Sequence, residues 1–236
     1  MRILALETTE RIASLAALDG SQVLLAKRLH PTRRSAQTLI SGIDGLLHEV
    51  GWRPADIQLI GLTIGPGSFT GLRIGVTVAK TLAYVTGAEV LGVNTLEVIA
   101  AQCSTDSAAV WAIMDAQRSQ MYAARFVREG NRVLQIRETK TEDVDAWLTT
   151  VQPEDVVNGP LLVALTTRLP PGARMADPQQ WAPRAECVGH LAFQRYMGGE
   201  RQDLWRLVPH YYRQSAAEEK LAQRETPQFD DSQSNC

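Results

Sequence analysis

The residues whose types and spacing best suit chemistry lie in one glycine-rich segment, residues 65–75, with the sequence GPGSFTGLRIG. An apolar run at 57–64 precedes this segment, and a helical pattern of apolar residues follows it to Thr86. A glycine-rich turn between a strand and a helix leaves backbone N–H groups facing outward at the helix N-terminus, where they can bind a phosphate or another anion. We therefore expect Gly65, Gly67 and Ser68 to be phosphate contacts for a nucleotide.

The spacing within residues 65–75 does not match the common phosphate-binding or nucleophile motifs. A P-loop needs a lysine before its serine or threonine, and Arg73 has the wrong spacing for that role. Thr70 stands where a GxGxxG motif needs its third glycine, and Pro66 stands where a GxSxG nucleophile elbow needs its first. A purely structural interpretation stays open, in which Ser68 or Thr70 caps the helix and the glycines permit a tight turn.

Two acidic residues, Glu7 and Asp115, each end an apolar run and begin a polar turn. If the two turns face each other across a cleft, this pair of carboxylates can hold a metal–nucleotide complex. Phosphate-binding hairpins of that kind place glycine beside the acid so that backbone N–H groups reach the phosphate. Here two threonines follow Glu7, and Ala116 and Gln117 follow Asp115. The alternative is that both acids lie in solvated turns.

The histidines and cysteines form no pattern of metal ligands. His30, His48, His190 and His210 include no pair four residues apart and no HExxH motif, and the three cysteines include no CxxC pair. No motif supports a Ser-His-Asp triad, although the residue types leave one open. We expect neither a metal site nor catalytic residues in this chain.

A repeated succession of elements organises the chain. An apolar run ends in Glu7 and two further strands follow it; after a polar hinge at 104–107, an apolar run ends in Asp115 and two strands again follow. Such internal similarity outweighs local patterns in predicting a fold, and here it predicts two related α/β lobes. The expected strands lie at 2–8, 12–18 and 22–29 in the first copy and at 109–115, 121–127 and 133–136 in the second.

We expect an N-terminal lobe at residues 1–103 and a C-terminal lobe at 104–214, each with a mixed sheet and flanking helices. Residues 215–236 contain five acidic and two basic side chains and few large apolar ones, which predicts a mostly disordered tail. The expected helices lie at 35–50, 70–86, 95–102, 143–148, 160–168 and 184–197.

Two of these helices have sequence features that suggest contacts on more than one side. In the helix at 70–86 apolar residues occupy most of the circumference, which is typical of burial on more than one side. The helix at 35–50 contains Gly42 and Gly45, a spacing that often marks close approach of another backbone. Either both helices are covered within their own lobe, or part of their surface binds a partner over roughly 800 Å². The residues we assign to such a partner-binding face are Leu39, Gly42, Ile43, Leu46, Arg73, Thr77, Lys80 and Tyr84.

The composition indicates a globular protein and excludes several function classes. The 236 residues carry a net charge of −2 and a pI of about 6.1, whereas a domain that binds nucleic acid by itself usually has a pI above about 9. The first apolar run is too short for a signal peptide, and no run approaches the roughly 18 apolar residues of a membrane span. Three widely spaced cysteines fit a reducing compartment. We expect a cytoplasmic protein with no membrane contact.

Four segments resemble motifs of the TsaB (YeaZ) family. Residues 65–75 resemble the signature of that family, and the Asn-Thr-Leu-Glu segment at 94–97 is similar to its Asn-Ser-Leu-Glu. Residues 114–118 resemble its Asp-Ala-Arg segment, from which Gln117 departs, and residues 209–213 match its C-terminal Pro-x-Tyr-x-Arg. The resemblance covers about residues 2–213 and leaves the tail uncovered.

The resemblance implies the duplicated actin-like ATPase (ASKHA, ribonuclease H-like) fold and a role in making threonylcarbamoyladenosine on tRNA. In that pathway TsaB acts with TsaD, its catalytic paralogue, and with the ATPase TsaE. TsaD-like enzymes carry two histidines one helical turn apart that bind a metal, and the matching positions here are Thr95 and Ile99. The resemblance therefore implies a pseudoenzyme that binds and activates TsaD directly.

On this interpretation the chain has no cofactor of its own, and ATP or ADP with magnesium binds only in the heteromeric complex that includes TsaE. It contacts tRNA only through that complex, and alone it forms a homodimer through the same apolar surface. Two alternatives stay open. One is an ATP-binding enzyme of the same fold, either kinase-like or the glycoprotease formerly proposed for such proteins; the other is an interaction module with other clients.

Overall fold

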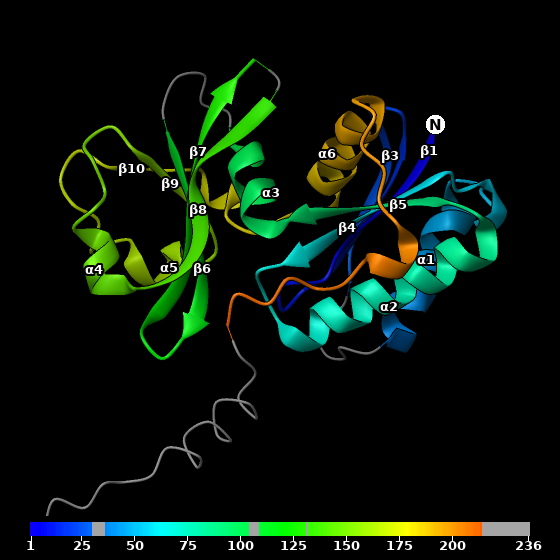
Figure 1. Cartoon of the computed structure of the whole chain (residues 1–236), viewed down its shortest axis with the longest axis horizontal. Helices are drawn as coiled ribbons and strands as arrows, with labels where there is room; N and C mark the ends of the chain where they lie inside the picture. The colour runs from blue at the N-terminus through cyan, green and yellow to red at the C-terminus, as the bar shows by residue number, and fades with distance from the viewer. Residues whose placement is uncertain (30–35, 104–108, 131, 214–236) are drawn as a thin grey trace, which may run out of the picture.

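The structure, a computed structural model, has two lobes that are each built on one five-stranded sheet (Figure 1). It describes residues 1–29, 36–103, 109–130 and 132–213. The tail expected at 215–236 and the hinge expected at 104–107 therefore lie outside the described residues. None of the helices in the described ranges combines the length and apolar character that crossing a membrane requires.

The first lobe contains strands β1 (Arg2–Glu7), β2 (Ser14–Asp19), β3 (Gln22–Arg28), β4 (Leu59–Gly65) and β5 (Glu89–Asn94), with helices α1 (Ala36–Glu49), α2 (Phe69–Thr86) and α3 (Thr95–Gln102) and the 3-10 turn η1 (Pro54–Asp56). Its strand order is β3-β2-β1-β4-β5. The first three strands are antiparallel neighbours, whereas β4 and β5 run parallel to β1. Parallel neighbours need crossover connections, and α1 and α2 supply them.

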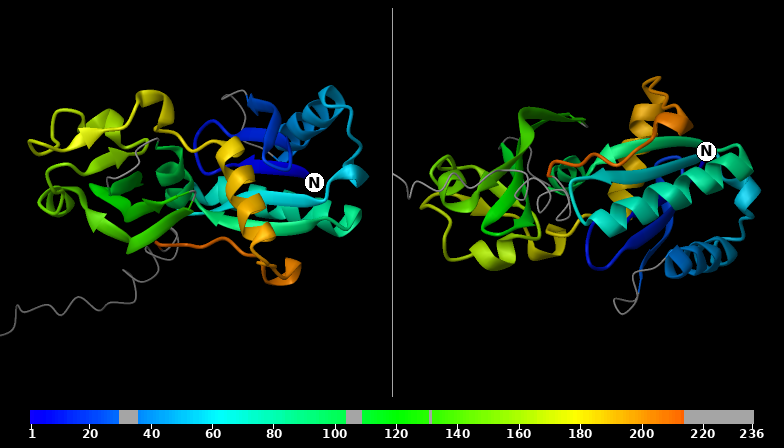
Figure 2. Two further views of the ribbon diagram at one scale, coloured as in Figure 1. Left: turned by 90° about the horizontal axis from the view of Figure 1, so that it is seen from above. Right: turned by 60° about the horizontal axis from the view of Figure 1, so that its bottom comes forward.

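Both faces of the first sheet are covered, and alternate residues of a strand point to opposite faces. In β1, Leu4 and Leu6 pack in one core with residues of α1 and α2. Ile3 and Ala5 pack on the opposite face, in a core with residues of α6 (Ala185–Met197). Figure 2 shows α6 on one side of this sheet and α2 on the other. This period of two follows from strand geometry when both faces are buried.

The second lobe contains β6 (Val110–Gln117), β7 (Gln120–Glu129), β8 (Arg132–Asp143), β9 (Val156–Asn158) and β10 (Arg174–Met175), with helices α4 (Val144–Leu148) and α5 (Leu162–Leu165) and the 3-10 turn η2 (Pro178–Gln180). Its strand order, β8-β7-β6-β9-β10, and its strand directions repeat those of the first sheet. Ala112 and Met114 of β6 pack in a core with α3, whereas Trp111 and Ile113 pack with α4 and α5. The sequence repeat is thus a structural duplication, and the chain has the expected actin-like ATPase fold.

Some helices pack in the lobe that their sequence position would not suggest. Leu96 and Ile99 of α3, which directly follows β5, lie in a core of the second lobe. Helix α6 comes from the C-terminal part of the chain but covers the first sheet. After α6 the chain forms the 3-10 turn η3 (Leu204–Arg206) and passes over α2, and its described part reaches the region between the lobes (Figure 1). The boundary at residues 103 and 104 stays a prediction, because three of the four hydrophobic clusters contain residues from both sides of it.

Candidate functional site

The glycine-rich segment joins the end of β4 to the start of α2. Gly65 and Gly67 have φ angles of 126° and 151°, a conformation that L side chains rarely adopt. Ser68 is the N-cap of α2, and its side-chain oxygen accepts a hydrogen bond from Gly71 N–H at 3.3 Å. The capping interpretation is therefore confirmed for Ser68. Thr70 lies inside the first turn of the helix.

The turn that follows β1 packs directly against this segment. The backbone N–H of Ser68 donates a hydrogen bond to the carbonyl oxygen of Thr9 at 3.0 Å. A Cβ atom added at Gly67 would collide with Thr9, and one added at Gly71 or Gly75 would collide with Thr8. These glycines allow two segments of the same chain to approach closely, which explains their spacing without a ligand.

Gly65 approaches a third segment of the chain. A Cβ atom at this position would collide with the carbonyl oxygen of His210, which belongs to the C-terminal segment. The chain's own backbone thus occupies the space beside Gly65, as it does beside Gly67. Phosphate contacts at Gly65, Gly67 and Ser68 stay a prediction, and this packing gives them no support.

The two predicted acids have opposite environments. Glu7 is fully buried at the end of β1, where one carboxylate oxygen accepts hydrogen bonds from the backbone N–H of Thr9, at 2.6 Å, and from the Thr9 hydroxyl. Its second oxygen is buried without a hydrogen-bond partner among the described residues. Burial, with a smaller contribution from the nearby Glu10, raises the pKa of Glu7 to about 7. The alternative of a solvated turn acid is therefore wrong for Glu7.

Asp115 is exposed to solvent, as that alternative expects, but it lies in β6 just before the turn and not in the turn itself. Its side chain is exposed and accepts a hydrogen bond from Gln117 N–H at 2.7 Å. The turn that follows has left-handed φ angles at Gln117, Arg118 and Ser119. The two carboxyl groups thus differ in exposure, and a metal–nucleotide complex held between them stays a prediction.

The residues of α1 that we assigned to a partner-binding face are turned inward, which corrects that assignment. Leu39, Ile43 and Leu46 are at most 4% exposed and form part of the first lobe's core. A Cβ atom at Gly42 would come within 2.5 Å of a methyl group of Leu29. The apolar stripe of α1 therefore attaches the helix to its own lobe. Gly42 thus packs against the side chains of Leu15 in β2 and of Leu29, directly after β3.

The residues assigned to this face on α2 are placed differently. Arg73, Thr77 and Tyr84 are exposed, and Lys80 is half-buried. Lys80 Nζ donates hydrogen bonds to the carbonyl oxygens of Trp205 and Leu207, both at 3.2 Å. The ring of Tyr84 meets the ring of Trp205 edge to face, with centroids 5.8 Å apart. The C-terminal segment is thus part of this surface.

Sequence reasoning missed the contribution of the C-terminal segment. Arg73 Nε donates a hydrogen bond to the Tyr211 hydroxyl at 3.0 Å, and the Tyr211 ring stacks on Phe69 with centroids 4.4 Å apart. The Pro-x-Tyr-x-Arg motif at 209–213 was the available signal, but nothing in its pattern identifies α2 as its neighbour. We define the α2 surface as the exposed residues Arg73, Thr77, Tyr84, Val85, Trp205 and Tyr211.

The positions that correspond to the metal-binding histidines of TsaD-like enzymes lie in the interior. Thr95 and Ile99, at the start and middle of α3, are both fully buried. The Thr95 hydroxyl has no hydrogen-bond partner among the described residues, and Ile99 has no group that could bind a metal. In the described part of the chain no three His, Cys, Asp or Glu side chains gather as a metal site would require.

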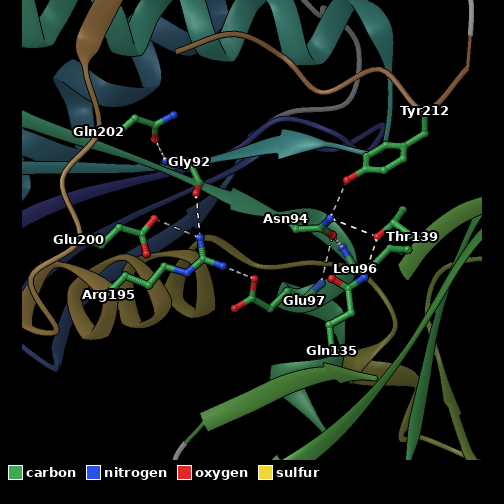
Figure 3. A network of polar contacts seen from close by, with 10 residues as sticks. All are labelled: Gly92, Asn94, Leu96, Glu97, Gln135, Thr139, Arg195, Glu200, Gln202 and Tyr212. Carbon is green, nitrogen blue, oxygen red and sulfur yellow. Dashed lines mark hydrogen bonds and ion pairs between the residues drawn. The ribbon is translucent and has the colours of Figure 1, made fainter. Parts of the chain in front are cut away.

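Asn94, directly before α3, connects several segments. Its side-chain oxygen accepts hydrogen bonds from Leu96 N–H at 2.8 Å and from Glu97 N–H at 3.4 Å, which caps the helix. Its amide nitrogen donates to the hydroxyls of Thr139, at 3.2 Å, and Tyr212, at 3.0 Å (Figure 3). The Asn-Thr-Leu-Glu segment therefore has a structural role at the junction of the lobes.

The chain is similar to known proteins in both sequence and structure. The model of the family described as "TsaD: tRNA N6-adenosine threonylcarbamoyltransferase" matches residues 26–163. The "tRNA threonylcarbamoyladenosine biosynthesis protein TsaB" of Escherichia coli is 29% identical over 232 residues, which cover 95% of this chain and 100% of the relative. The protein of the same name from Bacillus subtilis is 28% identical over 155 residues, 66% of this chain and 68% of the relative.

Two solved structures from Pseudomonas aeruginosa are also similar to this chain. The structure described as "YeaZ from Pseudomonas aeruginosa" superposes with a TM-score of 0.76 at 25% sequence identity and covers 89% of this chain and 99% of that one. A second Pseudomonas aeruginosa structure, described as an uncharacterized protein with similarity to peptidase YEAZ, has a TM-score of 0.77 at 25% identity. It covers 90% of this chain and 99% of the solved chain.

Proposed function

The chain belongs to the TsaB (YeaZ) family, and we propose that it is a non-catalytic subunit that binds TsaD and favours the active geometry of that enzyme. Family membership places the chain in the biosynthesis of threonylcarbamoyladenosine on tRNA. The direct contact with TsaD, the activation of TsaD and the lack of a reaction of its own are what we propose beyond that.

The α2 surface is the observation that carries this proposal. Tyr84, Val85 and Trp205 leave 69%, 75% and 69% of their surface exposed. Large apolar side chains that gather on an exposed face mark interaction sites in soluble proteins, and aromatic residues and arginine are enriched at the centres of interfaces. This surface therefore has the composition of a partner-binding face.

The α2 surface is also held rigid before any partner binds. Val76, Ala79 and Ala83 bury the opposite face of α2 in the first lobe's core. The hydrogen bonds from Lys80 hold the backbone beside Trp205 against the same helix. A surface that is ordered in advance loses less conformational entropy on binding, which favours affinity.

Three observations support a subunit without its own chemistry. Thr95 and Ile99 provide no metal ligands where TsaD-like enzymes carry histidines. The glycine-rich segment packs against the chain's own turn at Thr8 and Thr9. Glu7 is fully buried, and one of its carboxylate oxygens already accepts hydrogen bonds from Thr9 of the same turn.

The remaining parts of the proposal concern the assembly. The chain alone pairs with a second copy through the α2 surface, and TsaD displaces that copy. TsaE joins the complex, ATP or ADP with magnesium binds only there, and tRNA is contacted only through the complex. Modification of tRNA in this pathway favours a cytoplasmic location.

Binding measurements by isothermal titration calorimetry test the proposal. We expect the chain to bind purified TsaD and to show no binding of ATP with magnesium when it is alone. Tyr84→Arg places a charge in the α2 surface and should weaken TsaD binding at least tenfold. Val163→Arg, at a side chain of α5 that is 74% exposed, is the matched control and should leave binding unchanged. Low-micromolar ATP binding by the isolated chain, lost in Glu7→Ala, would instead support the alternative of an ATP-binding enzyme.

A further inference from the structure

We propose that residues 207–213, here called the strap, hold the two lobes in one fixed relative orientation. The strap follows η3 and includes the Pro-x-Tyr-x-Arg motif. This proposal does not depend on the proposed function, because it concerns contacts within the chain alone.

The first end of the strap is anchored in the first lobe. Leu207 is fully buried in the core that α1 and α2 form with the first sheet. The backbone N–H of His210 donates a hydrogen bond of 2.7 Å to the carbonyl oxygen of Ile64 in β4. Tyr211 stacks on Phe69 with ring planes 7° apart. These contacts involve core packing, a backbone hydrogen bond and an aromatic stack, so this end is not a loosely held surface loop.

The other end of the strap is anchored in the second lobe. The carbonyl oxygen of Tyr212 accepts a hydrogen bond from the Thr141 hydroxyl in β8 at 3.0 Å. Its ring packs against the second lobe's core and meets Tyr122 at a centroid distance of 6.4 Å. Arg213 Nη1 donates hydrogen bonds to the carbonyl oxygens of Ala116 and Gln117, at the end of β6.

Two adjacent tyrosines therefore bind different lobes. Tyr211 lies on α2 of the first lobe, whereas Tyr212 lies on β7 and β8 of the second. Two consecutive residues therefore bridge the lobes with little slack in the backbone between them. The Tyr212 hydroxyl also accepts the hydrogen bond from Asn94, which links the strap to the start of α3 (Figure 3).

The strap adds a connection between the lobes to two that the chain already makes. Helix α3 runs directly from β5 of the first sheet and packs against the second sheet. The chain also returns from η2 in the second lobe to α6, which covers the first sheet. Two connections define an axis about which the lobes can still rotate, and the contacts of the strap with β6 and β8 oppose this rotation.

Distances between spin labels on the two lobes test this proposal. Labels at Ile40→Cys in α1 and Val163→Cys in α5 occupy exposed side chains of different lobes that do not contact the strap. The native cysteines are replaced by alanine, and circular dichroism checks that each variant is folded. We expect one narrow distance distribution in this background. The double variant Tyr212→Ala with Arg213→Ala should broaden it at least twofold.

A matched control and a milder variant make the result interpretable. Arg206→Ala, just before the strap, removes an exposed side chain whose ion pair is with Asp203 in the same turn, and it should leave the distribution unchanged. If the double variant does not fold, Tyr212→Phe with Thr141→Val removes only hydroxyl groups and should still produce measurable broadening. A distribution as narrow as that of the background in a folded strap variant would overturn the proposal.

Discussion

Lys80 Nζ of α2 lies 3.2 Å from the carbonyl oxygen of Trp205, so the helix and the C-terminal segment form one continuous surface. The same lysine binds the carbonyl oxygen of Leu207, whose side chain lies in the core of the first lobe. The exposed aromatic rings of Tyr84 and Trp205 therefore stand on a backbone that is fixed from two sides. This relationship makes α2, rather than α1, the centre of the proposed partner-binding face.

Trp205→Ala should weaken both the homodimer and the complex with TsaD. The indole is 69% exposed and is supported by the edge of Tyr84, and exposed aromatic anchors often contribute 2 kcal/mol or more to binding, roughly thirtyfold in affinity. Sedimentation velocity measures the first effect and calorimetry the second. An unchanged affinity, with the fold intact, would remove the C-terminal segment from the interface.

Gly71→Ala should destabilise the chain by about 2–4 kcal/mol, because its Cβ would displace the backbone at Thr8. Gly45→Ala is the matched control within a helix. Its Cβ would meet only Lys27 Nζ at 3.9 Å, so the better helix propensity of alanine should stabilise the chain by about 0.5–1 kcal/mol. Urea denaturation measures both changes. Equal effects of the two substitutions would refute close packing at Gly71.

Glu7 should make the stability of the chain fall as the pH rises. Burial raises its pKa from 4.5 to about 7 in the folded state, so the folded state binds more protons than the unfolded state between these values. The contribution of Glu7 to the free energy of unfolding is therefore greatest below about pH 4.5. It falls as the pH rises towards 7 and is constant above about pH 7. The total change is about 3 kcal/mol.

Glu7→Gln isolates this effect, because glutamine is nearly the same shape and does not titrate. We expect the difference in unfolding free energy between the variant and the parent to shift in favour of the variant as the pH rises from 5 to 8. Thermal denaturation at a series of pH values measures it. A difference that stays constant with pH would show that Glu7 is ionised in the folded chain.

Many of the secondary-structure elements could be predicted because their signals are local. Helix α2 ends at Gly87, as predicted, and this glycine has a left-handed φ angle of 75°. Strands β1 and β6, which contain Glu7 and Asp115, each include an apolar run. A strand needs such a run when both faces of its sheet are buried. The helix expected at 160–168 is shorter in the structure, Leu162–Leu165.

The candidate site could be predicted only in part because its contacts are not local. The sequence does not distinguish a glycine that makes room for a phosphate from one that makes room for the backbone of Thr8. Gly42 illustrates this, since its spacing with Gly45 suggested a partner but its Cβ position faces Leu29 of the same lobe. The two tyrosines at 211 and 212 likewise give no sign that each binds a different lobe. Such facts depend on which segments meet in space.

The most direct test of the proposed role is reconstitution of tRNA modification with purified components. The chain alone, supplied with tRNA and an activated threonylcarbamoyl donor, should form no threonylcarbamoyladenosine. TsaD with TsaE should gain activity when the chain is added, and Tyr84→Arg should abolish most of that gain whereas Val163→Arg should not. Modification by the isolated chain, or full activation by the Tyr84→Arg variant, would contradict the account.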